Sequence, residues 1–381
     1  MGNLCKKFQA PMHCFRVKNC LTSRRFFAGA SMTTPNETTG CLVFADGESY
    51  FGVGFGATGE AVGELCFNTA MSGYQEIMTD PSYAGQIVAF TFPHIGNVGA
   101  NAEDDEASEP YALGMVTRFD PTAPSSWRAA EPLDAWLARR GRVGLGGVDT
   151  RRITRRLRER GAAHVVVAHH PEGKFDIDAL RAKAAAFPGL EGMDLAKEVS
   201  CRQSYEWDQT RWNWPEGYGR QGAPRRRVVA IDYGAKRNIL RNLASAGCQV
   251  TVLPATATAE EVLARDPEGV FLSNGPGDPA ATGEYAAPAI RKLVDSGLPV
   301  FGICLGHQML ALALGGKTKK MLFGHHGANH PVKELATGKV EVTSMNHGFT
   351  VDADSLPDGV EPSHVSLFDG SNCGIRMKDR P

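Results

Sequence analysis

The sequence predicts an α/β protein in which a mixed α+β domain, rich in strands, precedes a domain built on a parallel sheet. Three observations support this fold class. The 381 residues suffice for two domains with separate cores. Strand and turn signals dominate the first half of the chain. From residue 228 onward, short apolar runs alternate with helical segments, which is typical of a parallel sheet covered by helices on both faces.

We divide the chain into four parts on this basis. Residues 1–39 form an N-terminal extension, residues 40–195 the mixed domain, residues 196–227 a linker and residues 228–381 the parallel-sheet domain. The extension is basic and carries no acidic residue through position 36. It is either an organellar transit peptide or sequence upstream of a start at Met32, and in both cases we expect it to be disordered.

The mixed domain begins with a predicted hairpin. Cys41–Ala45 and Ser49–Val53 are apolar runs, and the turn dipeptide Asp46-Gly47 joins them. Gln86–Phe92 is a further predicted strand.

Two helices follow in this domain, Leu133–Arg140 and Thr150–Gly161. The second is strongly basic, with arginine at positions 151, 152, 155, 156, 158 and 160. Such a helix either exposes a solvated charged face or contacts an acidic surface of a partner, and the sequence leaves both interpretations open.

The linker is rich in Trp, Gly, Pro and Arg and lacks apolar periodicity. We expect its tryptophans, Trp207, Trp212 and Trp214, to pack across the junction between the two domains.

Strands and helices alternate in the last part of the chain. The expected strands are Val228–Asp232, Gln249–Leu253, Gly269–Ser273 and Val300–Ile303. The expected helices are Lys236–Gly247, Ala259–Arg265, Tyr285–Gly297 and His307–Leu314. Ligands of such sheets bind at the carboxyl ends of the strands, where the loop 274–279 and the turn at Cys304 fall.

Cys304 follows the last of these strands and precedes the last helix, between Gly302 and Gly306. The two glycines permit a sharp turn that a Cβ would obstruct. The turn places the sulfur at a helix N-terminus, where the N–H groups favour thiolate over thiol. Because the thiolate attacks carbonyl carbons, Cys304 is the candidate nucleophile; an inert core cysteine is the alternative.

Attack on an amide carbonyl generates an oxyanion that needs positioned N–H donors. The backbone N–H of Leu305 is one candidate donor. The loop Gly275-Pro276-Gly277 could supply another, unless it is simply a tight turn.

A thiol mechanism also needs a general base, usually a histidine oriented by a carboxylate. None of the downstream histidines is followed by a convincing carboxylate at a strand end; they are His307, His325, His326, His330, His347 and His364. The predicted final strand, Gly374–Met377, and the turn after it would leave a sheet edge unpaired. We therefore expect the natural domain to continue beyond Pro381.

Composition argues against several functional classes. With 42% hydrophobic residues, 22% charged residues and a net charge of −1, the chain shows no sign of binding nucleic acid or spanning a membrane. Its nine scattered cysteines lack the spacing of a zinc site or a disulfide framework, so we expect no metal. A reducing cytoplasm fits best, or an organelle matrix if the extension is a transit peptide.

The motifs resemble those of a known family. Phe301–Gln308 (FGICLGHQ) resembles the nucleophile motif of class I glutamine amidotransferases, and Leu272–Pro279 (LSNGPGDP) resembles their oxyanion loop. The mixed domain narrows the resemblance, because Gly63–Tyr83 and Phe92–Asn97 are similar to the small subunit of carbamoyl-phosphate synthase. The resemblance extends from about residue 40 to residue 381.

The resemblance implies a flavodoxin-like amidotransferase domain that hydrolyses L-glutamine through a γ-glutamyl thioester on Cys304. Ammonia would pass through a tunnel to a large subunit, in a heterodimer or higher oligomer. There ATP, Mg²⁺ and bicarbonate would yield carbamoyl phosphate for arginine and pyrimidine synthesis, with no cofactor in the small subunit. The family's glutamine-binding positions match Ser82, Gly275, Gly277, Leu305, Gln308, Asn346, Gly348 and Phe349.

One departure from the family pattern affects the activity. The family's catalytic histidine and glutamate lie in a His-Pro-Glu segment soon after the position that matches Pro381, the last residue of this sequence. The resemblance therefore also admits a catalytically incomplete subunit that binds glutamine or acts as a scaffold. A stand-alone cysteine hydrolase of the same fold is a further alternative, although such an enzyme needs no second domain of this pattern.

Overall fold

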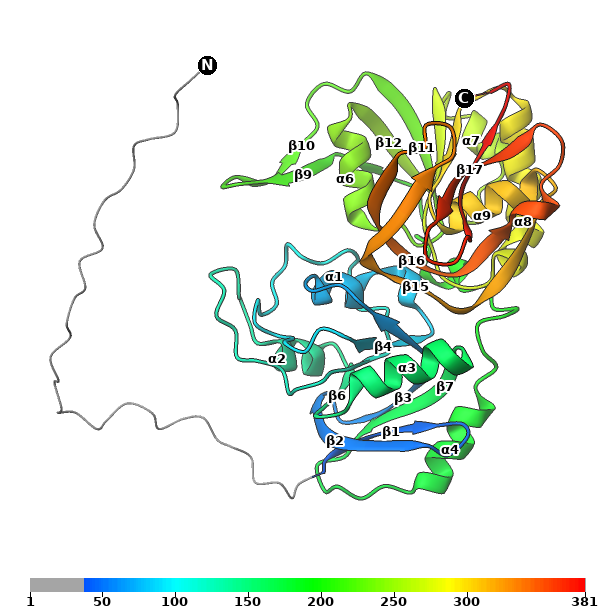
Figure 1. The fold of residues 1–381 in the computed structure, drawn as a ribbon. Helices are drawn as coiled ribbons and strands as arrows, with labels where there is room; N and C mark the ends of the chain where they lie inside the picture. Colours follow the sequence, from blue (N-terminus) through cyan, green and yellow to red (C-terminus); the bar gives the residue numbers. More distant parts are fainter. Residues whose placement is uncertain (1–37, 381) are drawn as a thin grey trace, which may run out of the picture. The chain divides into compact units, whose positions relative to one another are not determined.

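The computed structural model describes residues 38–380, so the predicted extension 1–39 lies almost entirely outside the described residues. The mixed domain contains a closed barrel with strand order β1-β2-β6-β5-β4-β3-β7 (Figure 1). Its strands are β1 (Gly40–Phe44), β2 (Ser49–Gly56), β3 (Gly59–Asn68), β4 (Gln86–Phe90), β5 (Gly114–Val116), β6 (Val143–Gly146) and β7 (Ala163–His169). The predicted hairpin is confirmed, because β1 and β2 pair antiparallel.

Strand β7 closes the barrel, because it pairs with both β1 and β3. Closure removes the unpaired edges that an open sheet would expose. The barrel core includes Leu42, Ile87 and Val167, all fully buried. The helices of this half are α1 (Tyr74–Thr79), the 3₁₀ helix η1 (Pro81–Tyr83), α2 (Leu133–Arg139), α3 (Thr150–Arg160) and α4 (Ile177–Ala186). The predicted helices correspond to α2 and α3.

The predicted linker has regular structure that its composition did not indicate. It contains α5 (Ala196–Val199), β8 (Tyr205–Trp207), β9 (Gln209–Asn213) and β10 (Gly217–Arg220). Strand β8 joins the second domain's sheet as an antiparallel edge, and β9 and β10 form a separate two-stranded sheet. Its strands are short and mostly exposed, so no apolar alternation marks them in the sequence.

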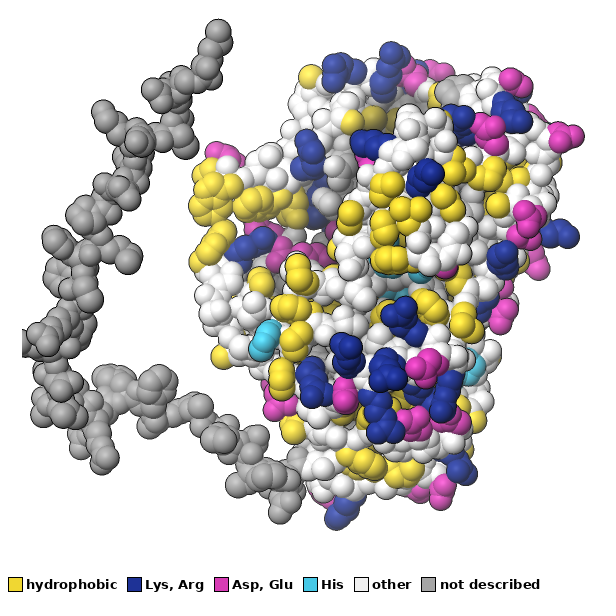
Figure 2. Space-filling view, viewed as in Figure 1, with side chains coloured by type: hydrophobic (Ala, Val, Ile, Leu, Met, Phe, Trp, Pro, Cys, Tyr) yellow, Lys and Arg dark blue, Asp and Glu magenta, His cyan; other side chains and the backbone are white. Residues whose placement is uncertain are grey.

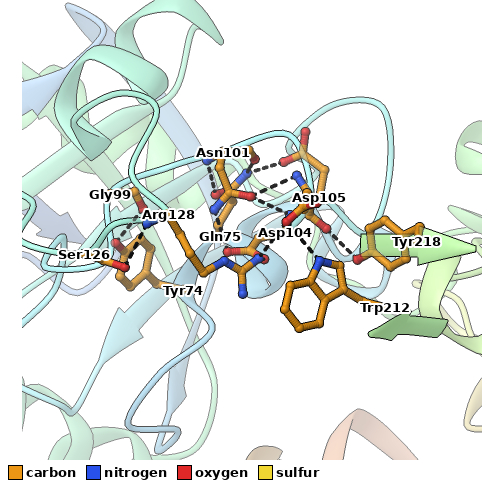
Figure 3. A network of polar contacts seen from close by, with 11 residues as sticks. Tyr74, Gln75, Gly99, Asn101, Asp104, Asp105, Ser126, Arg128, Trp212 and Tyr218 are labelled. Atoms are coloured by element: carbon orange, nitrogen blue, oxygen red, sulfur yellow. Dashed lines mark hydrogen bonds and ion pairs between the residues drawn. The ribbon is translucent and has the colours of Figure 1, made fainter. Parts of the chain in front are cut away.

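Two of the three tryptophans of this segment pack as expected. The Trp212 indole N–H donates to Glu103 Oε2 at 3.0 Å, and the Trp214 ring lies 4.9 Å from Trp127 in the mixed domain. Figure 3 shows Trp212 and Tyr218 reaching the polar network of the mixed domain. Trp207 is different, because it packs against the parallel sheet of its own half.

The parallel sheet predicted for the second half is confirmed, with strand order β14-β13-β11-β12-β8. Its parallel strands are β11 (Arg226–Asp232), β12 (Cys248–Pro254), β13 (Gly269–Leu272) and β14 (Val300–Gly302). The helices between and after them are α6 (Arg237–Ser245), α7 (Ala259–Leu263), α8 (Pro279–Asp295) and α9 (Leu305–Ala313).

Helix α8 begins six positions before its predicted start, and the cause is local. The Asp278 side chain accepts a hydrogen bond from the Ala280 N–H, and Pro279 occupies the first helical position. Both are typical of a helix N-terminus. The sequence motif around Pro279 was instead assigned wholly to a loop.

A second, four-stranded sheet follows in the order β16-β15-β17-β18. Its strands are β15 (Lys317–Glu334), β16 (Val340–Asp352), β17 (Val360–Ser366) and β18 (Asn372–Met377), and the 3₁₀ helix η2 (Ala353–Ser355) follows β16. The long β15–β16 pair brings the histidine-rich segment and Asn346 beside the Cys304 turn.

Within residues 38–380, no helix is both long and apolar enough to cross a bilayer. In the same part of the chain, no three His, Cys, Asp or Glu side chains gather in a geometry suited to a metal ion.

Candidate active site

Cys304 occupies the sharp turn between β14 and α9, as predicted. Its backbone φ is 54°, a left-handed conformation that is rare for a residue with a side chain. A Cβ on Gly302 would lie 2.5 Å from Gly306 backbone, and a Cβ on Gly306 would lie 2.2 Å from the Leu272 carbonyl oxygen. Both glycines are therefore required by close backbone packing, and the turn projects the sulfur from the end of the sheet.

Two backbone N–H groups face the Cys304 sulfur, those of Leu305 and Gly275, and both lower the pKa of the thiol. The N–H of Leu305 and the loop that contains Gly275 were the candidate oxyanion donors predicted from the sequence. The Gly275 backbone fits closely here, because an added Cβ would lie 2.1 Å from the Tyr233 carbonyl oxygen. The loop 274–279 and the turn at Cys304 thus form one site.

The resting state of the sulfur differs from the expected thiolate. Burial, followed by the negative charge of Asp80, raises the pKa of Cys304 to about 11. The thiol accordingly donates a hydrogen bond to the Asn346 carbonyl oxygen at 3.2 Å. The helix N-terminus does favour thiolate, but desolvation of the charged form outweighs it.

Asp80, which sequence reasoning missed, lies at the centre of the polar contacts around the sulfur. Its buried carboxylate accepts from the Asn346 side-chain amide at 2.9 Å and from the Ser82 backbone N–H at 2.9 Å. The Lys236 ammonium lies 3.4 Å from the same carboxylate, which raises the pKa of Lys236. Lys236 in turn lowers the pKa of Cys304. Asp80 and Lys236 lay within motif segments, but neither has a distinctive local pattern.

Asn346 and Ser82, both predicted, each contact a further polar residue besides Asp80. The side-chain oxygen of Asn346 contacts His326 Nδ1 at 2.8 Å. Burial lowers the pKa of His326 to about 4, so its imidazole is neutral. The Asn274 side-chain amide donates to Ser82 Oγ at 3.0 Å, which joins the mixed domain to the oxyanion loop.

A cavity of about 680 Å³ opens beside the sulfur, and four predicted residues line it: Cys304, Gln308, Asn346 and Phe349. The Gln308 side-chain amide donates to the Phe349 carbonyl oxygen at 2.6 Å. Glycine at position 348 does not line this cavity, although its two neighbours do. Gly277 does not line the cavity either; it packs against the segment 193–195, where an added Cβ would lie 2.6 Å from the Met193 carbonyl oxygen.

One histidine has the carboxylate partner that the sequence did not reveal. His325 Nε2 lies 3.0 Å from Asp369 Oδ2. His325 does not line the cavity at Cys304, whereas His307, His347 and His364 do. The hydrogen bonds of residues 38–380 give the sulfur one protein partner beyond the two facing amides, the carbonyl of Asn346.

Two family models and the curated relatives indicate the same family for this chain. Residues 42–167 match the family model of the carbamoyl-phosphate synthase small chain, CPSase domain, and residues 229–381 match that of class I glutamine amidotransferases. A carbamoyl phosphate synthase small chain from Ruegeria pomeroyi is 73% identical over 91% of this chain and 89% of its own length. The Brucella canis small chain is 63% identical over 91% of this chain and 86% of its own. A solved glutamine amidotransferase from Thermotoga maritima is 20% identical, with a TM-score of 0.33, over 40% of this chain and 71% of that structure.

Proposed function

The chain belongs to the family of carbamoyl-phosphate synthase small chains, and from this premise we propose that Cys304 hydrolyses L-glutamine to supply ammonia to a large synthetase subunit. The observation that carries the proposal is the convergence of the Leu305 and Gly275 N–H groups on the Cys304 sulfur. N–H donors beside the nucleophile are the groups that a developing oxyanion needs, which supports the proposal.

The reaction proceeds through an acyl-enzyme. The Cys304 sulfur attacks the side-chain carbonyl carbon of glutamine, and the Leu305 and Gly275 N–H groups hydrogen-bond to the oxyanion. The C–N bond then breaks, and the thiol proton is transferred to the leaving nitrogen so that ammonia departs. Water hydrolyses the γ-glutamyl thioester, which releases glutamate and restores the thiol.

Residues at the cavity are suited to substrate recognition. Gln308 and the backbone near Asn346 and Phe349 supply hydrogen-bonding groups of the kind that read an α-amino and an α-carboxylate group, and Ser82, which does not line the cavity, contacts the oxyanion loop. No cofactor is assigned to this chain. ATP and Mg²⁺ are used by the large subunit, which converts the ammonia and bicarbonate to carbamoyl phosphate for arginine and pyrimidine synthesis in the cytoplasm.

The proposal is tested by incubating the chain with radiolabelled L-glutamine, alone and with the large subunit, and quenching in acid. We expect a covalent glutamyl adduct that maps to Cys304, and release of glutamate and ammonia. Cys304→Ser should abolish the adduct and lower turnover by roughly 10³-fold or more. Cys373→Ser is the matched control, because Cys373 lines the same cavity. This variant should keep both the covalent adduct and the turnover. An adduct that persists in Cys304→Ser contradicts the proposal.

A second candidate function is glutamine binding without sustained hydrolysis. It is favoured by the pKa of about 11 at Cys304, which keeps the nucleophile protonated at neutral pH. The same experiment separates the two functions. A single burst of one ammonia per chain, with no later release when the large subunit is present, would support the binding role.

A further inference from the structure

The acidic segment 101–106 has a place in the fold that the proposed function leaves unexplained. It carries Glu103, Asp104, Asp105 and Glu106, and it contacts α1, α6 and the β9–β10 hairpin. Figure 2 shows acidic side chains, with Lys and Arg side chains close by, gathered below this hairpin, and Figure 3 shows several contacts of the segment. Most of these contacts join the two halves of the chain, whereas those of Glu106 lead toward Cys304.

The segment is fixed to α1. The Gln75 side-chain amide donates to Asp105 Oδ1 at 2.6 Å, and the Glu106 N–H donates to Thr79 Oγ1 at 2.9 Å. Gln75 and Thr79 are both buried. Because Thr79 directly precedes Asp80, Glu106 is held at a defined position relative to the Asp80 carboxylate.

Glu106 also caps α6 from outside that helix. Lys236 occupies the N-cap position of α6, but its side chain makes no capping hydrogen bond, and the first turn contains no acidic residue. Instead, the Glu106 carbonyl oxygen accepts from the Arg237 N–H at 3.0 Å, and the Glu106 carboxylate accepts from the Asn238 N–H at 2.8 Å. N–H groups of a first turn have no acceptor within their own helix, and a carboxylate there also interacts favourably with the helix dipole. The start of α6 therefore depends on Glu106.

Glu106 thereby contacts a chain neighbour of each member of the Asp80–Lys236 ion pair. These neighbours are Thr79 and Arg237. The two charged groups of the pair lie 3.4 Å apart. Asp80 raises the pKa of Lys236 most strongly, and Glu106 raises it further against the opposing effect of burial. One residue thus holds the backbone beside both members of the pair.

This ion pair is connected to the nucleophile. Burial and the Asp80 charge raise the pKa of Cys304, whereas Lys236 lowers it. The Lys236 N–H donates to the Asn274 side-chain oxygen at 3.1 Å, and Asn274 directly precedes Gly275, whose N–H faces the sulfur. A displacement of Lys236 would therefore weaken an interaction that stabilises the thiolate.

From these contacts we propose that Glu106 is a positioning residue, which holds the start of α6 so that Lys236 stays beside Asp80 and the Cys304 sulfur. Glu106 does not line the cavity at Cys304, so it acts through Lys236. The inference rests on the proposed function only for its consequence in catalysis, because the reactivity of the sulfur is measured without glutamine.

The test measures the rate of Cys304 alkylation by iodoacetamide at pH 8 in the full chain. Glu106→Ala should lower this rate about five-fold, because less thiolate forms when Lys236 moves away from Asp80. Glu106→Gln keeps an oxygen that can accept from the Asn238 N–H, so its rate should stay within about two-fold of the unmodified rate. If Glu106→Ala does not fold, Glu106→Asp, which is shorter by one methylene group, should give a smaller fall in the same direction.

A double-mutant cycle separates positioning from a general loosening of the fold. Lys236→Met alone should slow alkylation, and adding Glu106→Ala should then change the rate by less than about 1.5-fold. Loosening would instead act equally in both backgrounds. Glu103→Ala is the matched control, because Glu103 lies on the same segment but accepts from the Trp212 indole N–H on the hairpin. This variant should keep the unmodified rate.

An unchanged alkylation rate in Glu106→Ala overturns the inference. An equal fall in Glu106→Gln overturns it too, as does an undiminished effect of Glu106→Ala in the Lys236→Met background. With L-glutamine as substrate, Glu106→Ala should lower kcat about five-fold with little change in KM, since Glu106 does not line the cavity. If the unmodified chain releases no ammonia while the alkylation results hold, the proposed function fails and the inference stands.

Discussion

At the scale of single residues, the reactivity of Cys304 is set by opposing contributions. Burial and the Asp80 charge raise the pKa of its thiol, whereas Lys236 and the Leu305 and Gly275 N–H groups lower it. The balance leaves a protonated sulfur surrounded by groups that stabilise negative charge. Such a site keeps the thiol protonated in the resting protein. It stabilises negative charge chiefly when the reaction with a substrate generates that charge.

This balance predicts the pH dependence of alkylation. Because the pKa is raised to about 11, the thiolate fraction of Cys304 is small at neutral pH and grows as pH rises toward that value. The rate of reaction with iodoacetamide should therefore rise about ten-fold per pH unit from pH 7 to 9, without reaching a plateau. Lys236→Met should slow the reaction throughout this range. Mass-spectrometric mapping of the labelled peptide gives the rate, and a plateau by pH 9 would contradict the assignment.

At the scale of elements, α1 carries a carboxylate in an unfavourable environment. Burial, with added repulsion from Asp104 and Glu106, raises the pKa of Glu76 to about 7. The folded state therefore binds this proton more tightly than the unfolded chain does. Glu76 contributes stability that is present below its unfolded pKa near 4.5 and is lost as pH rises through about 7.

Glu76→Gln should consequently stabilise the protein at pH 8 by about 1–3 kcal/mol, a range that allows for partial solvent screening. The gain should vanish near pH 4, where glutamate is protonated. Urea unfolding at both pH values measures the difference. Glu191→Gln, at an exposed position, is the control and should change stability by less than about 0.5 kcal/mol at either pH. Equal stabilisation at pH 4 and pH 8 would rule out the electrostatic explanation.

The elements also show what sequence patterns can and cannot predict. The turn at Cys304 was predictable because its glycine requirement is contained in a few consecutive residues. The closure of the barrel was not, because it depends on β7 pairing with two strands distant in sequence. The β15–β16 pair also escaped prediction, because its register shifts near His325 and His330 interrupt any apolar alternation.

The same division holds for the site. Cys304, Gln308 and Asn346 were identified from motifs, and the structure brings them to one cavity. Asp80 and Lys236 were missed, because their importance lies in a contact between residues 156 positions apart. The raised pKa of the Cys304 thiol could not be foreseen from the sequence, since burial is a property of the folded chain.

At the scale of the whole molecule, the candidate site is assembled from both halves of the chain. Asp80 and Ser82 belong to the mixed domain, whereas Lys236, Asn274 and Asn346 belong to the second half. A further contact between the two halves lies at α6, where the Glu106 carboxylate accepts a hydrogen bond from the Asn238 N–H at 2.8 Å. Neither half alone contains the polar contacts that hold Asn346 and the oxyanion loop.

Asp80→Ala tests this shared construction. The change leaves Lys236 without its carboxylate and frees the Asn346 amide, so we expect a loss of about 2–4 kcal/mol in unfolding free energy. Asp80→Ala should also abolish the protection that bound L-glutamine gives Cys304 against alkylation, because Asn346 and Ser82 lose the carboxylate that both contact.

Asp194→Ala is the matched control. Asp194 bonds to Thr282 and Tyr285, away from the Cys304 cavity, so this variant should lose stability but keep protection. If glutamine protects Cys304 equally in Asp80→Ala and the unmodified chain, the mixed domain does not organise the site.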